Sequence, residues 1–517
     1  MNAESRSSTR FFGRRRWGLL AAFLFAAAYL VLNLFVRPAI PMARGYDDQI
    51  FLASAARLSS GQVIYRDFFE YYLPGIDYLY AFLIDRFGAR AWIPNACLVV
   101  LGLGLFAAAV WLGGMLMSRE AAIFSGFLFL FAAYRTYLDA SPHWYAALTI
   151  VLAIAILARE RSRSRLLVAG ALIGVATCFA QHHGAFATVG VLGFLVWEAW
   201  KDGRDTTTLI KECASFLTPT AIIVAACVAY FSWLAGPTAF FNSTIVFPLK
   251  YWSEGLGAGW SNYVLIEIVS SAMHRDFHLV RDLILGLLVP WVYIVSAIWF
   301  KPSPESSRGD TWRRIVLLNF VGAAMFASIV NSAGYWRIAV VSLPAFLVAV
   351  WSIETKLGVI VIRILTVIAV LAMVSDIRAS QRNWYYSIET PSGRIALSVD
   401  DPLSQLQWFA ARTHQGDYVF QALGSNLYFW LGLRNPTKVW WLTPCEFTRP
   451  EQVDDVLRDL ELHAPRFILW NGDLDESLCG ASSDHIQPVR DYLHAHYHKV
   501  QDLTPEFGPT TSAWELK

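Results

Sequence analysis

Long apolar stretches recur along the first three quarters of the chain, and they limit the folds open to it. A helix needs about 20 apolar residues to cross the hydrocarbon of a bilayer. Eleven stretches approach that length, at residues 17–36, 91–117, 120–137, 143–158, 165–182, 184–200, 214–235, 281–300, 312–331, 336–353 and 357–375. Only 16% of the 517 residues are charged, against about 25% in soluble proteins. A polytopic α-helical membrane protein of about eleven spans is therefore predicted.

The distribution of lysine and arginine predicts the orientation, because cytoplasmic loops carry an excess of both. Basic residues gather before residue 17 and at 159–165, 201–211 and 301–314. None lies in the short turns 138–142, 183 and 332–335. The N-terminus is therefore expected in the cytoplasm, with the first stretch as an uncleaved span rather than a signal peptide. The segments expected outside are the loops 37–90 and 236–280 and everything after residue 376.

The last part of the chain differs in character from the apolar part. Strand-like runs, "GDYVFQAL" and "RFILWNG", alternate with helix-like runs, "DPLSQLQWFAARTH" and "RPEQVDDVLRDLELHA". Such alternation is typical of a small α/β domain. We therefore expect a transmembrane domain at 1–376 and a soluble extracytoplasmic α/β domain at 377–517.

Cys445 and Cys479 are the two cysteines of this expected outer domain. In an oxidising compartment two such cysteines are paired more often than free, provided that their Cα atoms come within about 4.4–6.8 Å. A disulfide is predicted, and two unpaired, half-buried thiols are the alternative.

Two adjacent carboxylates, Asp47 and Asp48, follow the first apolar stretch. They open "DDQIFLASAARLSSG", whose apolar residues recur at helical spacing up to Gly61, so a short helix lying on the membrane is expected. A second stretch, "GIDYLYAFLIDRFG", is also read as interfacial. The simplest interpretation of the acidic pair is a helix N-terminus, where aspartate is favoured by exposed N–H groups. The alternative is a site at the outer membrane surface.

The pattern around this pair, "YDD…A..L.SGQ.IYRDF….LPG…Y", resembles the first outer loop of GT-C membrane glycosyltransferases, which use polyprenyl-phosphate donors. That family includes protein O-mannosyltransferases and the aminoarabinose transferases of lipid A. The matching positions are the acidic pair Asp47 and Asp48, an alanine at Ala53 or Ala56, the turn residues Gly61, Tyr65 and Asp67, and the step Leu73-Pro74. "YLDASPHWYAAL" likewise resembles the family's later acidic position, with Asp139 in that place.

Three features depart from the family pattern. The second acid is aspartate rather than the commoner glutamate, and one proline replaces the usual two. In "AGALIGVATCFAQHHG", glutamine or histidine stands at the usual lysine position.

The late segment "YWRIAVVSLPAFLV", in contrast, resembles the family's "Y…LP" span. The resemblance covers about residues 17–375 and implies an integral membrane glycosyltransferase.

Sugar transfer from a lipid phosphate needs a base for the acceptor hydroxyl and cations for the departing phosphate. Asp47 is the predicted base, and a single displacement would invert the anomeric centre. Asp48 and Asp139 are expected to position the acceptor or a divalent cation, Mg²⁺ or Mn²⁺, because hard cations prefer carboxylate oxygens.

Candidate donor-binding residues are Arg337 with its neighbour Tyr335, and Lys250 in "FPLKYW". The alternative for Arg337 is a snorkelling residue in an aromatic belt, and for Lys250 an ordinary loop lysine. His182 and His183 are further site candidates that could instead satisfy turn backbone. His274 and His278 have the i, i+4 spacing of two metal ligands on one helix face, but no third ligand is identified. They are therefore expected to be exposed loop residues.

The sequence thus predicts a multi-pass enzyme of the inner or plasma membrane that works on the cell envelope. Its partners would be a lipid-linked sugar donor, a glycan, lipid or protein acceptor, and membrane lipids. A net charge of +2 argues against a nucleic-acid partner. The alternatives are a transporter or flippase of lipid-linked or polymeric sugars, and a non-catalytic subunit with the same fold.

Overall fold

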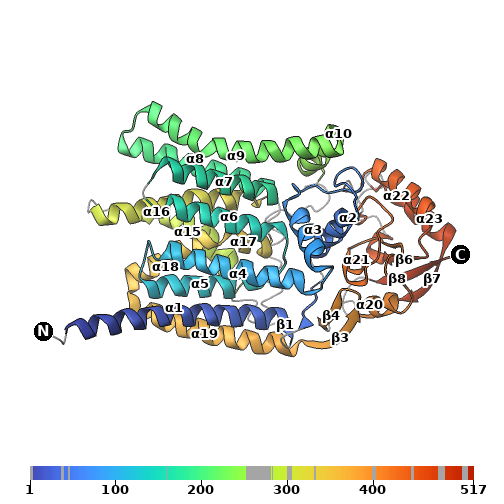
Figure 1. Ribbon diagram of the computed structural model, residues 1–517, viewed down its shortest axis with the longest axis horizontal. Helices are drawn as coiled ribbons and strands as arrows, with labels where there is room; N and C mark the ends of the chain where they lie inside the picture. Colours follow the sequence, from blue (N-terminus) through green and yellow to red (C-terminus); the bar gives the residue numbers. More distant parts are fainter. Residues whose placement is uncertain are drawn as a thin grey trace.

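Helices make up most of the chain. The computed structural model describes residues 4–36, 40–44, 47–159, 161–251, 281, 283–299, 306–330, 334–398, 403–443, 447–475, 484–503 and 510–517. The longer helices lie side by side as a bundle, and a mixed α/β region lies at the end away from the N-terminus (Figure 1). The prediction of a mostly helical chain is therefore confirmed.

The bundle helices coincide with the apolar stretches. Their bounds are α1 Glu4–Leu34, α4 Trp92–Gly113, α5 Arg119–Ala132, α6 Pro142–Leu157, α7 Arg163–Phe179, α8 Gln181–Asp202, α9 Thr206–Ala235, α15 Val289–Trp299, α16 Ser306–Ala327, α17 Tyr335–Val341, α18 Leu343–Leu357 and α19 Val359–Arg382. Several of these helices begin after a polar N-cap residue, whose side-chain oxygen accepts a hydrogen bond from a free N–H of the first turn. Ser118 accepts from Ala121 before α5, and Asp205 accepts from Thr208 before α9.

Four of the described helices are long and apolar enough to cross a bilayer: residues 17–34 of α1, and all of α4, α9 and α19. A fifth span results if α17 and α18, which meet at an angle of 68°, are counted as one. Several of the others are short, such as α5 with 14 residues and α6 with 16.

Two shorter helices, α2 (Asp48–Ser59) and α3 (Gly75–Phe87), lie between the bundle and the C-terminal region (Figure 1). The first was expected as a short helix on the membrane from its apolar spacing, and the second as an interfacial stretch. Leu52 of α2 and Ile76 of α3 are completely buried in the main core. The remaining short elements here are β1 (Phe35–Val36), β2 (Ile40–Pro41), α10 (Pro237–Phe241) and α11 (Phe247–Lys250), with the 3₁₀ helix η1 (Tyr134–Tyr137) and the π-helical turns η2 (Asn242–Val246) and η3 (Ile284–Leu288).

A four-stranded sheet with the order β5-β6-β8-β7 forms the centre of the C-terminal region. Strand β5 is parallel to β6, whereas β8 is antiparallel to both β6 and β7. The bounds are β3 Trp384–Thr390, β4 Gly393–Ser398, α20 Leu403–Ala410, β5 Val419–Gln421, α21 Asn426–Leu431, α22 Pro450–His463, β6 Phe467–Asn471, the 3₁₀ turn η6 Gly472–Leu474, α23 Gln487–His496, β7 Tyr497–Asp502 and β8 Thr511–Leu516. Strands and helices therefore occur where the alternating runs placed them. Cys445, Cys479, His274 and His278 lie outside the described residues.

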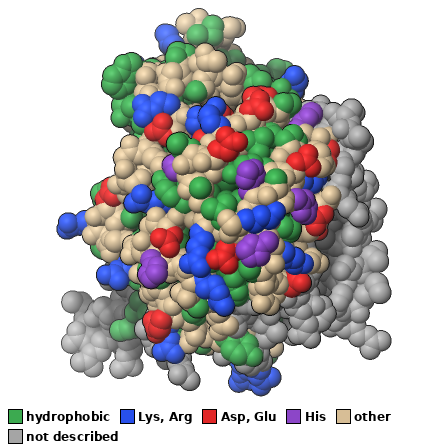
Figure 2. Space-filling view, turned by 90° about the vertical axis from the view of Figure 1, so that its right-hand side faces the viewer, with side chains coloured by type: hydrophobic (Ala, Val, Ile, Leu, Met, Phe, Trp, Pro, Cys, Tyr) green, Lys and Arg blue, Asp and Glu red, His purple; other side chains and the backbone are tan. Residues whose placement is uncertain are grey.

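The surface of the C-terminal end carries mixed charges. Figure 2 looks at this end, and its described part shows Lys and Arg, Asp and Glu, and His side chains interspersed with hydrophobic ones. A mixture of charged groups is typical of a surface that faces water.

Backbone hydrogen bonds tie this region to the segment that carries the acidic pair. The Ala43 N–H donates to the Ala396 oxygen of β4 at 2.8 Å, just before the acidic pair. The Phe69 N–H donates to the Lys438 oxygen, also at 2.8 Å, just before α3. The segment between the first helix and α3 is thus held at two points by residues from the far end of the chain.

Candidate active site

Asp47 occupies the N-cap position of α2, but its side chain forms no capping hydrogen bond. The residue is half-buried, and Asp48 beside it is only 4% exposed. Capping, the simplest interpretation of an aspartate at a helix start, therefore does not account for the Asp47 carboxylate.

Asp139 lies in the turn before α6 and holds the start of α2. Its Oδ1 accepts the Asp48 N–H at 2.9 Å, and its Oδ2 accepts the Tyr137 hydroxyl at 2.6 Å. The side chain is completely buried. Although 91 residues separate Asp48 from Asp139, the structure brings the predicted acids together.

Burial raises the pKa of all three carboxyl groups, because it removes water from the charged form. The pKa of Asp48 rises to about 7, with the neighbouring Asp47 charge adding to the effect of burial. For Asp47, burial raises the pKa and the Arg337 guanidinium acts in the opposite direction. A raised pKa suits a general base, since proton transfer is most efficient when the pKa lies near the working pH.

Glu70 is a buried acid that the sequence analysis did not select. Its Oε1 accepts the N–H groups of Tyr71 at 2.8 Å and Tyr72 at 3.0 Å. Its Oε2 is buried with no hydrogen-bond partner among the described residues. Burial, and next the charge of Asp77, raise the Glu70 pKa well above its usual value. Its position directly before "YYLPG", within the family-like loop, was the one available signal.

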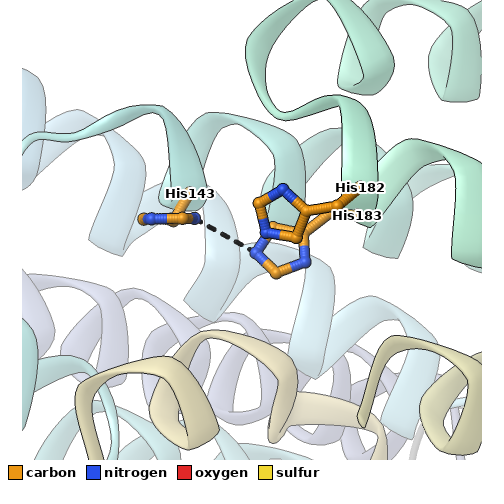
Figure 3. A group of neighbouring side chains, drawn as sticks. All are labelled: His143, His182 and His183. Carbon is orange, nitrogen blue, oxygen red and sulfur yellow. Dashed lines mark hydrogen bonds between the residues drawn. The ribbon is translucent and has the colours of Figure 1, made fainter. Parts of the chain in front are cut away.

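Three histidines lie close together (Figure 3). His143 starts α6, while His182 and His183 start α8. The His143 Nδ1 and His183 Nε2 atoms lie 3.1 Å apart. His182 and His183 had been selected as candidates, but His143 had not. The next residue of α8, Gly184, packs closely against α7, since a Cβ added there would meet the Thr177 hydroxyl at 2.1 Å.

The three histidines also form a group that could hold a metal ion. Within the described ranges, they are the one group of three or more His, Cys, Asp or Glu residues whose ligand atoms all lie within 4.8 Å of one another. Asp47, Asp48 and Asp139 do not form such a group.

Helix α17 brings two predicted donor-binding residues to the site. The Arg337 guanidinium lies 4.3 Å from the centre of the Trp336 ring. Trp336 in turn packs 5.2 Å from the ring of Tyr137, the residue bonded to Asp139. Tyr335 is buried at the start of the helix. Arg337 therefore lies on the acidic side of the bundle, where it lowers the pKa of Asp47.

Lys250, the third predicted donor-binding residue, is exposed at the end of α11, and its ammonium lies 4.9 Å from the Tyr251 ring. Phe247 of the same helix packs against Phe69 and Tyr71, with ring centres 4.8 and 5.6 Å apart. Because these two residues flank Glu70, α11 borders the acidic loop.

Comparison with known proteins identifies the fold. No protein-family model and no curated protein sequence matches the chain. The structure is similar to that of ArnT from Cupriavidus metallidurans bound to undecaprenyl phosphate, with a TM-score of 0.61 and 14% identity over 96% of this chain and 98% of that one. It is also similar to the Archaeoglobus fulgidus oligosaccharyltransferase.

In its apo form, the oligosaccharyltransferase matches with a TM-score of 0.52 and 12% identity over 95% of this chain and 74% of that one. Tethered to an acceptor peptide containing the NVT sequon, it matches with a TM-score of 0.52 and 13% identity over 95% and 73% of the two chains. The GT-C fold that the sequence resemblance implied is therefore confirmed.

Proposed function

We propose that this chain is an integral membrane glycosyltransferase that moves a sugar from a polyprenyl-phosphate donor to an acceptor at the outer face of the membrane. The observation that carries the proposal is Asp47: a half-buried carboxylate at a helix start that takes no part in capping and whose pKa is raised by burial and lowered by the charge of Arg337. It lies in a chain whose fold is similar to that of ArnT bound to undecaprenyl phosphate.

The proposed reaction is a single displacement. The Asp47 carboxylate takes the proton of the acceptor hydroxyl while the hydroxyl oxygen attacks the anomeric carbon. The bond from that carbon to the donor phosphate oxygen breaks, and the phosphate leaves with the electron pair, so the anomeric centre inverts. Arg337, together with Tyr335 and Lys250, stabilises the negative charge that grows on the phosphate.

Asp48 and Asp139 support this chemistry in different ways. Asp139 fixes the start of α2 through the Asp48 N–H, so it positions Asp47 indirectly. A divalent cation remains a prediction for Asp48 and Asp139. Mg²⁺ is usually held by one or two carboxylates together with substrate phosphates, so the donor phosphate would complete the oxygen ligands.

The proposed topology has eleven spans, with the N-terminus in the cytoplasm and residues 377–517 outside as an α/β domain. The short bundle helices support this count because they run alongside the four long ones (Figure 1). A transporter or flippase is less favoured, because the fold is similar to that of ArnT and the oligosaccharyltransferase. An assay of sugar transfer distinguishes the enzyme from a non-catalytic subunit with the same fold.

Asp47→Asn tests the proposal. Asparagine keeps the shape and removes the basic oxygen, so we expect the transfer rate to fall by about two to four orders of magnitude. The matched control is Asp85→Asn, which removes an exposed carboxylate of α3 and should leave the rate unchanged. Transfer from radiolabelled lipid-linked sugar by purified protein is the measurement.

Near-normal transfer by folded Asp47→Asn would overturn the assignment of the base. Asp48→Asn and Asp139→Asn should instead raise KM or change the response to added Mg²⁺. If either abolished turnover while Asp47→Asn did not, the roles of the acids would be exchanged.

A further inference from the structure

We infer that His143, His182 and His183 form a site for a transition-metal cation of the Zn²⁺ class, separate from the carboxylates. Imidazole is a preferred ligand for such ions, whereas Mg²⁺ and Mn²⁺ prefer oxygen. Two of the side chains are buried and His182 is half-buried, and they meet from the first turns of α6 and α8 (Figure 3).

The spacing of the ring nitrogens fits such an ion. Zn–N bonds of about 2.0–2.1 Å in a tetrahedral site place the ligand nitrogens about 3.4 Å apart. The His143 Nδ1 and His183 Nε2 atoms are already 3.1 Å apart. The ligand atoms of all three histidines lie within 4.8 Å of one another, so a modest rotation of side chains completes the set.

Hydrogen bonds on the outer side of the cluster set the tautomer of His183. The Ser328 hydroxyl donates to the Met325 oxygen at 2.6 Å, so its Oγ accepts the Nδ1–H of His183 at 3.0 Å. The Nε2 of His183 therefore carries a lone pair that points at His143. Metal-binding histidines usually have this arrangement, with the second ring nitrogen donating to a fixed acceptor.

His143 has a similar outer partner, because its Nε2 lies 3.3 Å from the Tyr72 hydroxyl. If this nitrogen donates to Tyr72, the Nδ1 of His143 also presents a lone pair, and a metal cation lies between two lone pairs. If it accepts from Tyr72, a proton on Nδ1 takes the place of the metal and donates to His183. An experiment must therefore determine whether a metal cation or a proton lies between His143 and His183.

The charges in and around the histidine cluster predict how tightly it binds a Zn²⁺-class cation. Three neutral imidazoles leave the fourth tetrahedral position open, as in zinc sites that bind water or substrate. Arg337 adjoins Trp336, whose ring lies 5.9 Å from that of His143, so a positive charge opposes the cation. We therefore expect weaker binding than in closed structural zinc sites.

Cobalt titration of the full chain tests this inference. Protein purified in detergent with a tag that lacks histidine is stripped with chelator and titrated with Co²⁺. The expected result is one Co²⁺ per chain with the intense visible bands of tetrahedral cobalt, displaced by one equivalent of Zn²⁺. The variant His182→Ala/His183→Ala should lose the bands, while His414→Ala, which removes a histidine whose side chain is 94% exposed, should keep them.

Ser328→Ala separates a metal site from a chain of hydrogen bonds. Loss of this outer partner should weaken Co²⁺ binding by about 10–100-fold while the stoichiometry at saturation stays at one. Absence of tetrahedral bands in the wild type, or equal bands in the double variant, would overturn the inference. His183→Gln, compared by thermal unfolding with and without Zn²⁺, provides a second readout if the double variant does not fold. None of these readouts depends on sugar transfer, so the proposed function stands or falls separately.

Discussion

Single residues around Asp47 determine how its charge responds to pH. Burial raises the Asp47 pKa and Arg337 lowers it, so the two effects work against each other at the proposed base. Water-poor surroundings and a fixed guanidinium are the usual means by which proteins tune a carboxylate. The observable consequence is the position of the acidic limb in the pH dependence of transfer.

Arg337→Gln should move this acidic limb to higher pH. The base acts only when it is deprotonated, and removing the guanidinium raises the pKa of Asp47, so more alkaline conditions are needed for full rate. Arg337→Lys keeps a positive charge and is the control. The measurement is kcat/KM against pH, and a limb that stays in place or moves to lower pH would contradict the interaction.

The sequence identified only some of the site residues. Asp47, Asp48 and Asp139 could be selected because acids beside apolar stretches are unusual and because their order resembles a family pattern. Glu70 and His143 could not, since Glu70 is a single acid between aromatic residues and His143 is a single histidine after the turn-like run "DASP". Their importance depends on packing between segments far apart in the sequence, as in the contact of His143 with His183.

At the scale of elements, an ion-pair cluster joins helices at the end of the bundle away from the proposed site. Glu198 of α8 is 2% exposed and accepts from Arg161 at 2.7 Å and Arg204 at 2.6 Å. Arg313 of α16 lies 3.9 Å away. One buried carboxylate therefore faces three guanidinium groups: one from the turn before α7, one from the turn after α8 and one from α16.

Glu198→Gln should destabilise the protein strongly. Breaking a buried ion pair leaves uncompensated charge, which typically costs about 3–5 kcal/mol. The control is Glu120→Gln, which removes the partner of Arg363 in a pair whose side chains are 48% and 62% exposed and should cost at most about 1 kcal/mol. Thermal unfolding in detergent compares them, and equal midpoints for the two variants would contradict a structural role of Glu198.

Element positions were easier to predict than element lengths. The apolar spacing located α2, and the alternating runs located β5 and β6. Helix ends depend on local capping and on neighbours instead. Helix α19, for example, continues to Arg382, past the expected end of its apolar stretch at residue 375, because charged residues can prolong a helix outside the hydrocarbon.

For the whole molecule, the proposed orientation in the membrane rests on the distribution of basic residues. A reporter fused after Arg378 should be external, and one inserted within 301–314 should be cytoplasmic. Alkaline phosphatase and green fluorescent protein fusions check this, since each is active on one side only. A cytoplasmic signal after Arg378 would remove the proposed common compartment of the acidic loop and the C-terminal region.

The hydrogen bond between Ala43 and Ala396 has a consequence for the order of events during synthesis. The acidic loop leaves the ribosome early, yet its partner strand β4 is made about 350 residues later. At roughly 5–20 residues per second, this delay is about 20–70 s. A nascent chain thus carries its proposed catalytic base for most of its translation without the strand that holds the loop, and the catalytic geometry forms only late in translation.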